Sequence, residues 1–257
     1  MVSVILPVYN ECNRLESCVR VVAAYLSREF PAYEIIVVED GSTDTSYEIA
    51  QSVASGVENV RLIHNDQRLG RGASLTEAIR ASKYDHVLYM DADLATDLKY
   101  TKKLVDCLKN GASVATGSRL MEGSRVSRPA VRDIPSRGYN FLVRLLFWSS
   151  LHDHQCGFKG FNRNEVLPVL DMVQDNHWFW DTELLLLCQL NGMRVDEFPV
   201  EWKHNGGNDL NASKVKVLKD VRAMARKLLA LKVRTLTSDL QVSHRKKSGV
   251  PNVERPR

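Results

Sequence analysis

The sequence lacks the features of a membrane-spanning or secreted protein. It has no run of 18 apolar residues, and the nearest candidate, Phe141–Leu151, is short and contains Arg144. Since a spanning helix needs about 20 apolar residues, we expect no transmembrane segment. The N-terminus opens directly into a strand pattern instead of a basic segment followed by an apolar one, so no signal peptide is expected.

Cysteine and glycine are missing where several protein classes need them. The five cysteines are scattered, odd in number and never spaced as Cys-x-x-Cys, which argues for a reducing compartment and against a disulfide framework. His152, His154 and Cys156 could be zinc ligands, but nothing supplies a fourth. No glycine-rich loop follows the first predicted strand, which argues against a dinucleotide-dependent dehydrogenase and a sugar nucleotidyltransferase.

The composition is that of a globular protein with an uneven charge. A chain of 257 residues, 44% hydrophobic and 26% charged, suits one large α/β domain. The net charge of +4 combines −6 over residues 1–212 with +10 over residues 213–257. A basic end on an acidic body indicates a polyanionic contact. Because no recognised nucleic-acid module is present, we expect an anionic membrane surface and no nucleic acid.

Strand and helix patterns alternate through the first half of the chain. Such β-α repeats predict an α/β fold with a mostly parallel, Rossmann-like sheet and helices on both faces. The expected strands are Val2–Val8, Glu34–Glu39, Val60–His64, His86–Met90 and Ser113–Thr116. The expected helices run from about Asn13 to Ser27, from a Ser42 or Thr43 cap to Ala54, from Gly72 to Ala81 and from Asp97 to Leu108.

The second half is less regular. An arginine-rich loop precedes an aromatic helix, two further helices, a late strand and a long basic helix. We assign residues 1–234 to one catalytic domain and residues 235–257, which are polar and basic, to a disordered tail. The expected elements are the helices Tyr139–Ser150, Asn164–Met172, Asp181–Gln189 and Ser213–Arg234 and the strand Val195–Trp202.

Two carboxylates one residue apart, Asp91 and Asp93, follow the buried run His86–Met90. The period of two of a strand would point both side chains the same way. At the carboxyl edge of an α/β sheet such a pair suits Mg²⁺ or Mn²⁺ neutralising a diphosphate. A solvated loop with two acids is the alternative for an isolated Asp-x-Asp.

The ends of the first two strands also carry polar groups. Pro7–Glu11 offers an aromatic ring, an amide and a carboxylate, which suit a base and ribose, although Asn10 could simply cap the next helix. Asp40 could bond a base edge or ribose hydroxyl, although Gly41–Asp44 is also an efficient turn and cap without a ligand. Arg68 or Arg71 could face phosphate.

Together these segments resemble the family 2 glycosyltransferases of A-type fold, in order and spacing, over about residues 2–234. Within that class the chain looks most like the polyprenyl-phosphate sugar synthases, the dolichyl-phosphate glucosyl- and mannosyltransferases. It departs from mannosyl relatives in having Ala95 where they often carry Gln near the metal, and Gln155–Lys159 leans toward the glucosyl type. The segments that carry the family resemblance are Pro7–Glu11, Glu39–Asp44, Gly70–Gly72 and Asp91–Asp93. Those that support the polyprenyl-phosphate class are Gly117–Arg119, Arg132 with Ser136–Gly138, Asp153–Lys159, Asp181–Leu185 and Val200–Trp202 with Ala212–Lys214.

The resemblance implies an inverting transfer of a hexose from a nucleotide-diphosphate sugar to a polyprenyl (dolichyl) phosphate. It implies Mg²⁺ or Mn²⁺ as cofactor and a location in the cytoplasm, peripheral on the cytoplasmic face of a membrane. The residues it assigns to the nucleotide sugar are Pro7, Val8, Tyr9, Asn10, Glu11, Asp40, Asp91 and Ala92. It assigns the metal to Asp91 and Asp93, catalysis to Asp93, Arg119 and Arg132, and the acceptor phosphate or diphosphate to Arg119, Arg132, Ser136 and Lys214.

Other interpretations stay open at this point. A family 2 transferase with a glycan or other hydroxyl acceptor would need a carboxylate base, and a non-catalytic basic scaffold would need none. Asp97 or the donor phosphates could complete the metal shell. Trp178 and Trp180 could contact sugar or lipid or belong to the core. The base candidates are Asp153, Asp181 and Glu183, and the basic helix carries an apolar stripe that could pack on the sheet or insert into lipid, namely Val217, Val221, Met224, Leu228 and Leu231.

Overall fold

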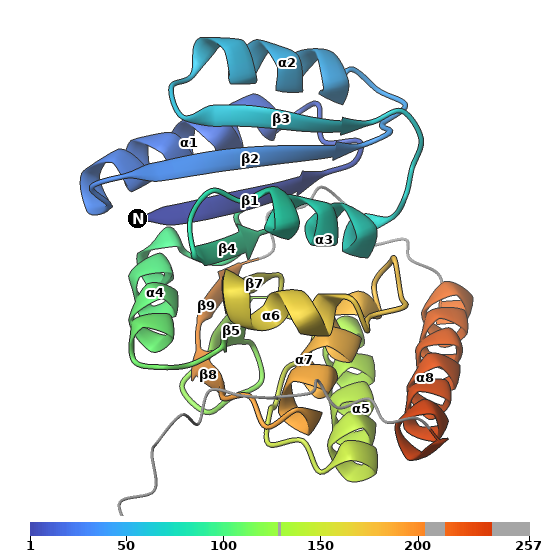
Figure 1. Cartoon of the computed structure of the whole chain (residues 1–257). Coiled ribbons are helices and arrows are strands. Elements are labelled where there is room, and N and C mark those ends of the chain that lie inside the picture. Colours follow the sequence, from blue (N-terminus) through green and yellow to red (C-terminus); the bar gives the residue numbers. More distant parts are fainter. Residues whose placement is uncertain (128–129, 204–213, 238–257) are drawn as a thin grey trace, which may run out of the picture.

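The computed structural model describes the backbone of residues 1–127, 130–203 and 214–237. Side chains are described for residues 1–127, 135–203 and 222–237. Seven strands form one sheet in the order β3-β2-β1-β4-β7-β5-β8 (Figure 1). All neighbours are parallel except β7, which runs antiparallel to β4 and β5. The strands are β1 Val2–Val8, β2 Tyr33–Asp40, β3 Val60–Asn65, β4 His86–Met90, β5 Val114–Ser118, β7 Phe158–Asn162 and β8 Val195–Pro199, and β6 Arg125–Ser127 pairs with β9 Glu201–Lys203 in a small second sheet.

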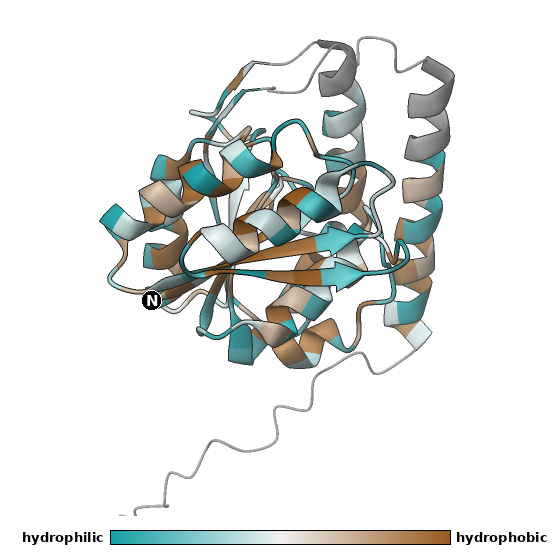
Figure 2. Cartoon of the chain, turned by 90° about the horizontal axis from the view of Figure 1, so that it is seen from above, coloured by the Kyte–Doolittle hydropathy of each residue, from teal (hydrophilic) through white to brown (hydrophobic). Residues whose placement is uncertain are grey.

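Helices cover both faces of the sheet because its strands are apolar on both sides. Ile35 and Val37 of β2 join one core cluster with α1, α2 and α4, whereas Ile36 and Val38 join the other with α3 and α5–α8. Figure 2 shows the strands as apolar along their length and polar at their carboxyl ends. The helices are α1 Leu15–Glu29, α2 Ser46–Gly56, α3 Arg71–Ala81, α4 Thr101–Lys109 after the short 3₁₀ helix η1 Leu98–Tyr100, α5 Ala130–Phe147, α6 Arg163–Leu170, α7 Trp180–Leu190 and α8 Lys214–Thr237.

The mostly parallel sheet with helices on both faces is confirmed, and strands β1 and β4 have the predicted bounds. Strands β6 and β7 were not predicted, since neither segment has an apolar period. The prediction of one strand over Val195–Trp202 is wrong, because the chain passes at Val200 from β8 in the large sheet to β9 in the small one. Capping of α2 by Ser42 or Thr43 is also wrong, because Thr45 precedes that helix and the Ser46 N–H at its start donates to Asp44 Oδ1 at 3.0 Å.

Helix α8 packs beside α5, and its apolar stripe belongs to the core. Leu228 and Leu231 are buried, and Met224 packs against the same cluster. Insertion of this stripe into lipid is therefore wrong for these three residues. The side chains of Val217 and Val221 lie outside the described residues. Of the predicted tail 235–257, residues 235–237 belong to α8 and residues 238–257 lie outside the described part of the chain. No helix in the described part of the chain is long and apolar enough to span a bilayer.

Candidate active site

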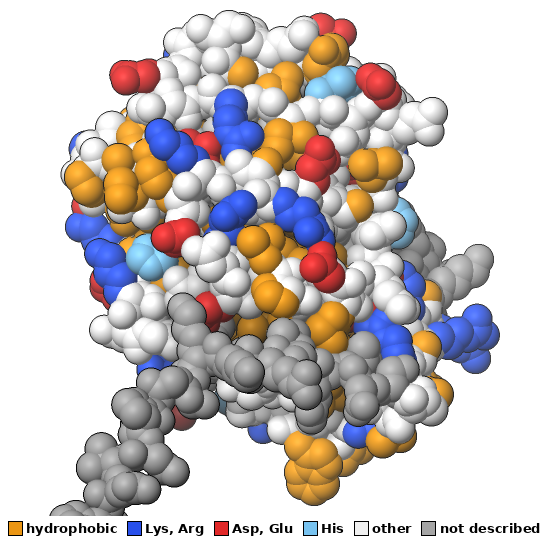
Figure 3. All heavy atoms as spheres, in the orientation of Figure 1, with side chains coloured by type: hydrophobic (Ala, Val, Ile, Leu, Met, Phe, Trp, Pro, Cys, Tyr) orange, Lys and Arg blue, Asp and Glu red, His pale blue; other side chains and the backbone are white. Residues whose placement is uncertain are grey.

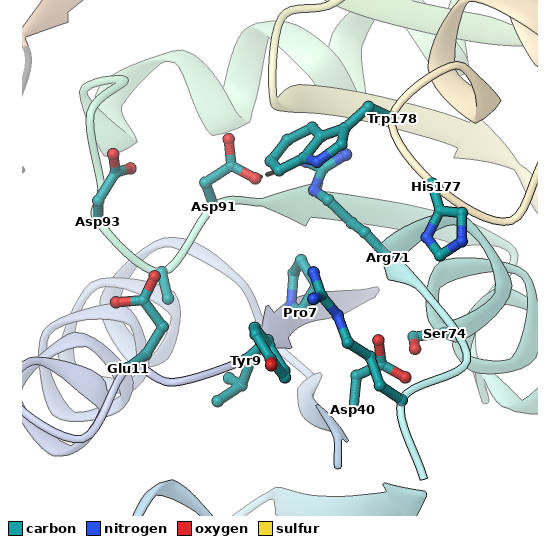
Figure 4. A pocket seen from close by; sticks show the side chains of 13 residues that line it. Pro7, Tyr9, Glu11, Asp40, Arg71, Ser74, Asp91, Asp93, His177 and Trp178 are labelled. Atoms are coloured by element: carbon teal, nitrogen blue, oxygen red, sulfur yellow. Dashed lines mark hydrogen bonds and ion pairs between the residues drawn. The ribbon is translucent and has the colours of Figure 1, made fainter. Parts of the chain in front are cut away.

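A pocket opens where the polar carboxyl ends of β1, β2 and β4 meet the start of α3 and the loop before α7 (Figure 4). Parallel strands bring their carboxyl ends to one edge, which is where α/β sheets bind ligands. All the predicted nucleotide-sugar residues except Asn10 line the pocket, and Asp93 joins them. The lining residues are Pro7, Val8, Tyr9, Glu11, Asp40, Arg68, Arg71, Ser74, Asp91, Ala92, Asp93, His177 and Trp178.

Asn10 ties two loops together instead of capping α1. Its Oδ1 accepts a hydrogen bond from the backbone N–H of Thr43 at 2.8 Å, and its own N–H donates to Ser42 Oγ at 2.9 Å. Its φ of +56° lies in the left-handed region, which Asn tolerates better than most residues. Arg14, not Asn10, precedes α1. Asn10 therefore fixes the loop that presents Tyr9 and Glu11.

One end of the pocket offers a ring and a fixed carboxylate. The Arg68 guanidinium lies 3.8 Å from the centre of the Tyr9 ring, a stacked cation–π arrangement. Asp40 is buried and accepts backbone N–H bonds from Leu69 at 2.8 Å and Gly70 at 2.9 Å. Position 70 requires glycine, because its φ is +106° and a Cβ there would lie 2.3 Å from Asn176 O. Asp40 thus shapes the loop that carries Arg68.

The carboxylates of Asp91 and Asp93 line the same pocket, but not for the predicted reason. Strand β4 ends at Met90, and residues 91–93 form a turn in which Asp93 Oδ1 accepts the Ala95 N–H at 3.0 Å. The alternation of a strand therefore does not apply to them. In Figure 4 Asp93 lies near Glu11, whereas Asp91 turns toward Arg71.

Glu11 adds a third carboxylate beside the pair. Burial raises the pKa of Glu11 most, the Arg14 guanidinium lowers it, and the charges of Asp93 and Asp91 raise it further, so the net pKa is above its ordinary value. Within the described residues no three His, Cys, Asp or Glu side chains gather closely enough to hold a metal by themselves. The donor set fits a hard cation that takes one or two carboxylates and completes its shell with phosphate oxygens.

Asp97 does not join these carboxylates. Its Oδ1 accepts the Lys99 N–H at 2.9 Å and caps η1, and the side chain lines a separate hollow with Arg125 and Trp202. The structure therefore places Asp97 outside the lining of the pocket that holds Asp91 and Asp93.

Arg71, for which the sequence offered only a possible contact with phosphate, bridges two acidic residues of the site. Its Nη2 donates to Asp91 Oδ1 at 2.5 Å and its Nη1 to Asp181 Oδ2 at 2.7 Å, with the side chain only 14% exposed. Burial lowers its pKa, but Asp91, Tyr89 and Asp181 raise it well above the ordinary value. The Gly70-Arg71-Gly72 spacing was the available signal, because two flanking glycines allow close approach of the loop before α7. Arg71 thus joins the strand β4 turn to α7.

A buried cation lies behind Arg71. Lys159 of β7 is fully buried, and its Nζ donates to Asp181 Oδ1 at 2.8 Å and to Cys156 O at 2.5 Å. The Tyr89 hydroxyl donates to the same carboxylate oxygen. Burial raises the pKa of Asp181, but Lys159 and Arg71 outweigh it and leave the pKa below its ordinary value. Asp181 is therefore held as an anion between two cations.

Arg119 and Asp153 form another buried pair. Arg119 donates to Asp153 through Nε at 2.7 Å, Nη2 at 2.9 Å and its backbone N–H at 3.0 Å. Burial raises the pKa of Asp153, but the Arg119 guanidinium outweighs it and holds the pKa well below the ordinary value. Arg119 does not line the pocket of Asp93, and its assignment to phosphate stays a prediction. Glu183, the last base candidate, is buried and paired with Arg234.

The remaining predicted residues fall in different places. Ser136 is half-buried on α5 and is not part of the pocket lining, and the side chains of Arg132 and Lys214 lie outside the described residues. His154 is buried between Asn140 and Ser149, and burial lowers its pKa to about 3, which leaves a neutral ring in the core. The two tryptophans separate: Trp178 lines the pocket and Trp180 is core.

Gly157 leaves the space that the Asp91 carboxylate occupies. A Cβ at Gly157 would lie 1.8 Å from Asp91 Oδ2, so the carboxylate must move in Gly157→Ala. We expect catalytic activity to fall roughly a hundredfold, because small misplacements of a positioning group cost about that much. Steady-state assays measure the activity, and thermal melts measure whether the variant keeps its stability. The matched control is Gly56→Ala, whose Cβ meets nothing within 4 Å. Unchanged activity in Gly157→Ala would show that the position of Asp91 does not matter.

Comparisons with known proteins point to one family. The sequence profile "Glycosyl transferase family 2" matches residues 3–166. Glycosyltransferase AglD of Haloferax volcanii is 45% identical over 89% of this chain, which spans only 36% of the length of AglD. The dolichyl-phosphate beta-glucosyltransferases of Dictyostelium discoideum and Homo sapiens are 32% and 30% identical, with 89% and 95% of this chain and 75% and 79% of theirs covered.

Solved structures share the fold. Glucosyl-3-phosphoglycerate synthase from Mycobacterium tuberculosis, in complex with Mn²⁺, uridine diphosphate and glucosyl-3-phosphoglycerate, superposes with a TM-score of 0.64 at 19% identity. The superposition covers 91% of this chain and 79% of that one. At this identity the likeness concerns the architecture, and it agrees with the A-type fold expected from the sequence.

Proposed function

Since the chain belongs to glycosyltransferase family 2, we propose that it moves a hexose, glucose in the first instance, from a nucleotide-diphosphate sugar to a polyprenyl (dolichyl) phosphate. The carrying observation is the pocket in which Asp91, Asp93 and Glu11 face Arg71 and Arg68 at the carboxyl ends of three strands. The names of the dolichyl-phosphate beta-glucosyltransferases support the acceptor and the sugar.

On the donor side, the two ends of the pocket suit the two ends of a nucleoside diphosphate. The Tyr9 ring and the Arg68 guanidinium offer a stacking surface for the base, and the loop held by Asp40 closes this end. Asp91 and Asp93 would hold Mg²⁺ or Mn²⁺, as the Mn²⁺ and uridine diphosphate in the mycobacterial structure suggest by analogy. When bound, the cation neutralises charge that develops on the leaving diphosphate.

On the acceptor side, the burial of the base candidates favours a phosphate over a hydroxyl. Asp153, Asp181 and Glu183 are each buried and held by a cation, so none is placed to remove a proton. A phosphate oxygen is already anionic near neutral pH. That oxygen forms the new bond to the anomeric carbon as the bond to the diphosphate oxygen breaks, and the nucleoside diphosphate leaves with the electron pair. No proton transfer is needed, and positioning carries the catalysis.

The same proposal places the protein at a membrane. A polyprenyl phosphate resides in a bilayer, and the basic residues of 213–257 would attract an anionic surface. All five cysteines are free thiols, which supports the cytoplasmic face. Arg119, Arg132, Ser136 and Lys214 remain our candidates for the acceptor phosphate or the diphosphate.

A donor panel tests this function. Radiolabelled uridine- and guanosine-diphosphate sugars are incubated with polyprenyl phosphate and Mg²⁺ or Mn²⁺, and the products are extracted into organic solvent. We expect metal-dependent label in the organic phase with release of one nucleoside diphosphate per sugar. A parallel arm offers a hydroxyl acceptor without phosphate. Label transferred only in that arm would replace the lipid-phosphate assignment with the glycan acceptor.

A further inference from the structure

Helices α5 and α8 each expose an apolar stripe that the core does not use. Phe141 and Leu145 are spaced i, i+4, and Leu229, Val233 and Leu236 are spaced i, i+4, i+7, so the helical members of each set lie on one face of their helix. Trp148 is 91% exposed and Leu236 is 74% exposed, which is unusual for side chains of this size. The stripes are Phe141 and Leu145 on α5, with Trp148 directly after its last residue, and Leu229, Val233 and Leu236 on α8.

The two helices lie side by side and run in the same direction (Figure 1). Their buried sides hold Val143 of α5 and Leu228 of α8 in the core, and Lys232 Nζ lies 5.1 Å from the Phe147 ring across the seam. Both stripes therefore approach the same end of the molecule. Figure 3 shows apolar side chains at that lower end, where α5 and α8 finish.

The charge of this surface has one sign. Residues 135–148 and 222–237 contain no Asp or Glu. Arg137 and Arg144 of α5 and Arg222 and Arg226 of α8 are exposed. Basic and apolar groups on one face match the headgroups and acyl boundary of an anionic bilayer. A second copy fits less well, since a two-fold contact would bring these like charges together.

We propose that the exposed stripes of α5 and α8, with their arginines, form the face that docks on an anionic bilayer. The proposal rests on the polyprenyl-phosphate acceptor above and names the surface that meets its membrane. Helix α5 is fixed to α7 inside the core, because the buried Tyr139 hydroxyl donates to Thr182 Oγ1 at 2.9 Å.

Vesicle co-sedimentation tests the docking face. The full chain is mixed with phosphatidylcholine vesicles that contain either no phosphatidylglycerol or a substantial fraction of it, at low and high salt. We expect binding to the anionic vesicles only, weakened by salt. The triple variant Phe141→Ser, Leu145→Ser, Trp148→Ser should lose binding, and Arg222→Glu with Arg226→Glu should weaken it roughly thirtyfold or more. The control Val21→Ser, at an exposed apolar residue of α1, should bind as the wild type does.

A soluble assay separates this proposal from the proposed function. Transfer to a short-chain polyprenyl phosphate in detergent should be unchanged in the triple variant, which also shows that it is folded. Wild-type protein that transfers sugar but ignores anionic vesicles would overturn the docking face alone. Vesicle binding without transfer to any polyprenyl phosphate would overturn the function alone. If sedimentation velocity shows a dimer that the triple variant dissociates, the face is an interface between copies and the bilayer assignment fails.

Discussion

Asp93→Ala is expected to abolish sugar transfer and leave the fold intact. The carboxylate faces the pocket, where we assign it to the cation that neutralises the leaving diphosphate, so its loss should lower the turnover number roughly a thousandfold or more. Its carboxylate accepts a hydrogen bond from the Ala95 N–H within the turn, and losing such a bond costs about 1 kcal/mol. Transfer assays measure the turnover number and thermal melts measure the stability. Mn²⁺ titration followed by electron paramagnetic resonance measures the affinity for the cation.

Two further variants isolate the charge of Asp93. Asp93→Asn keeps an oxygen that can accept the Ala95 N–H, so it should retain the turn and still lose activity and Mn²⁺ affinity. Asp97→Asn is the matched control, because Asp97 makes the same kind of bond to Lys99 but lies outside the pocket lining. We expect it to remain active. Full activity of the wild type with the divalent cation chelated, at saturating donor, would remove the metal from the mechanism.

Lys159→Met is expected to be the most destabilising single change near the site. Lys159 is fully buried, and without its ammonium group Asp181 keeps, among the described residues, Arg71 alone as an ion-pair partner. Breaking a buried ion pair from one side costs about 3–5 kcal/mol, which lowers the melting temperature of a domain of this size by about 10 °C. Urea denaturation measures the free energy of unfolding.

Changing Asp181, the partner of Lys159, separates the loss of the ion pair from the cost of an unpaired buried charge. The double variant Lys159→Met, Asp181→Asn should cost less than the sum of its single changes, because neither charge is then left alone. Arg194→Met, which breaks the exposed pair with Asp196, should leave the melting temperature nearly unchanged. If Lys159→Met is purified with a wild-type melting temperature, the buried pair does not stabilise the fold, and if it does not fold at all, Asp181→Asn measures the pair from the other side.

The local sequence determined the elements whose chemistry repeats along the chain. Val2–Val8 and His86–Met90 are apolar runs bounded by polar residues, and they became strands with those bounds. Because parallel strands align their carboxyl ends, the polar groups that follow them were expected to meet, and Tyr9, Asp40 and Asp91 do line one pocket. The Asp-x-Asp pair was found for this reason, although the strand alternation invoked for it does not reach beyond Met90.

Tertiary structure alone decided which charges are available for chemistry. Lys159 and Asp181 lie 22 positions apart and Arg71 and Asp181 lie 110 apart, and nothing local marks them as partners. Strand β7 escaped prediction for the same reason, since a lysine in a buried strand is acceptable only once an anion from α7 neutralises it. The same holds for α8, where the sequence shows an apolar stripe that could pack on the sheet or insert into lipid, and only the packing of the helix decides that its Leu228 is core. Period and polarity are properties of a segment, whereas ion pairing and burial depend on which segments the fold brings together.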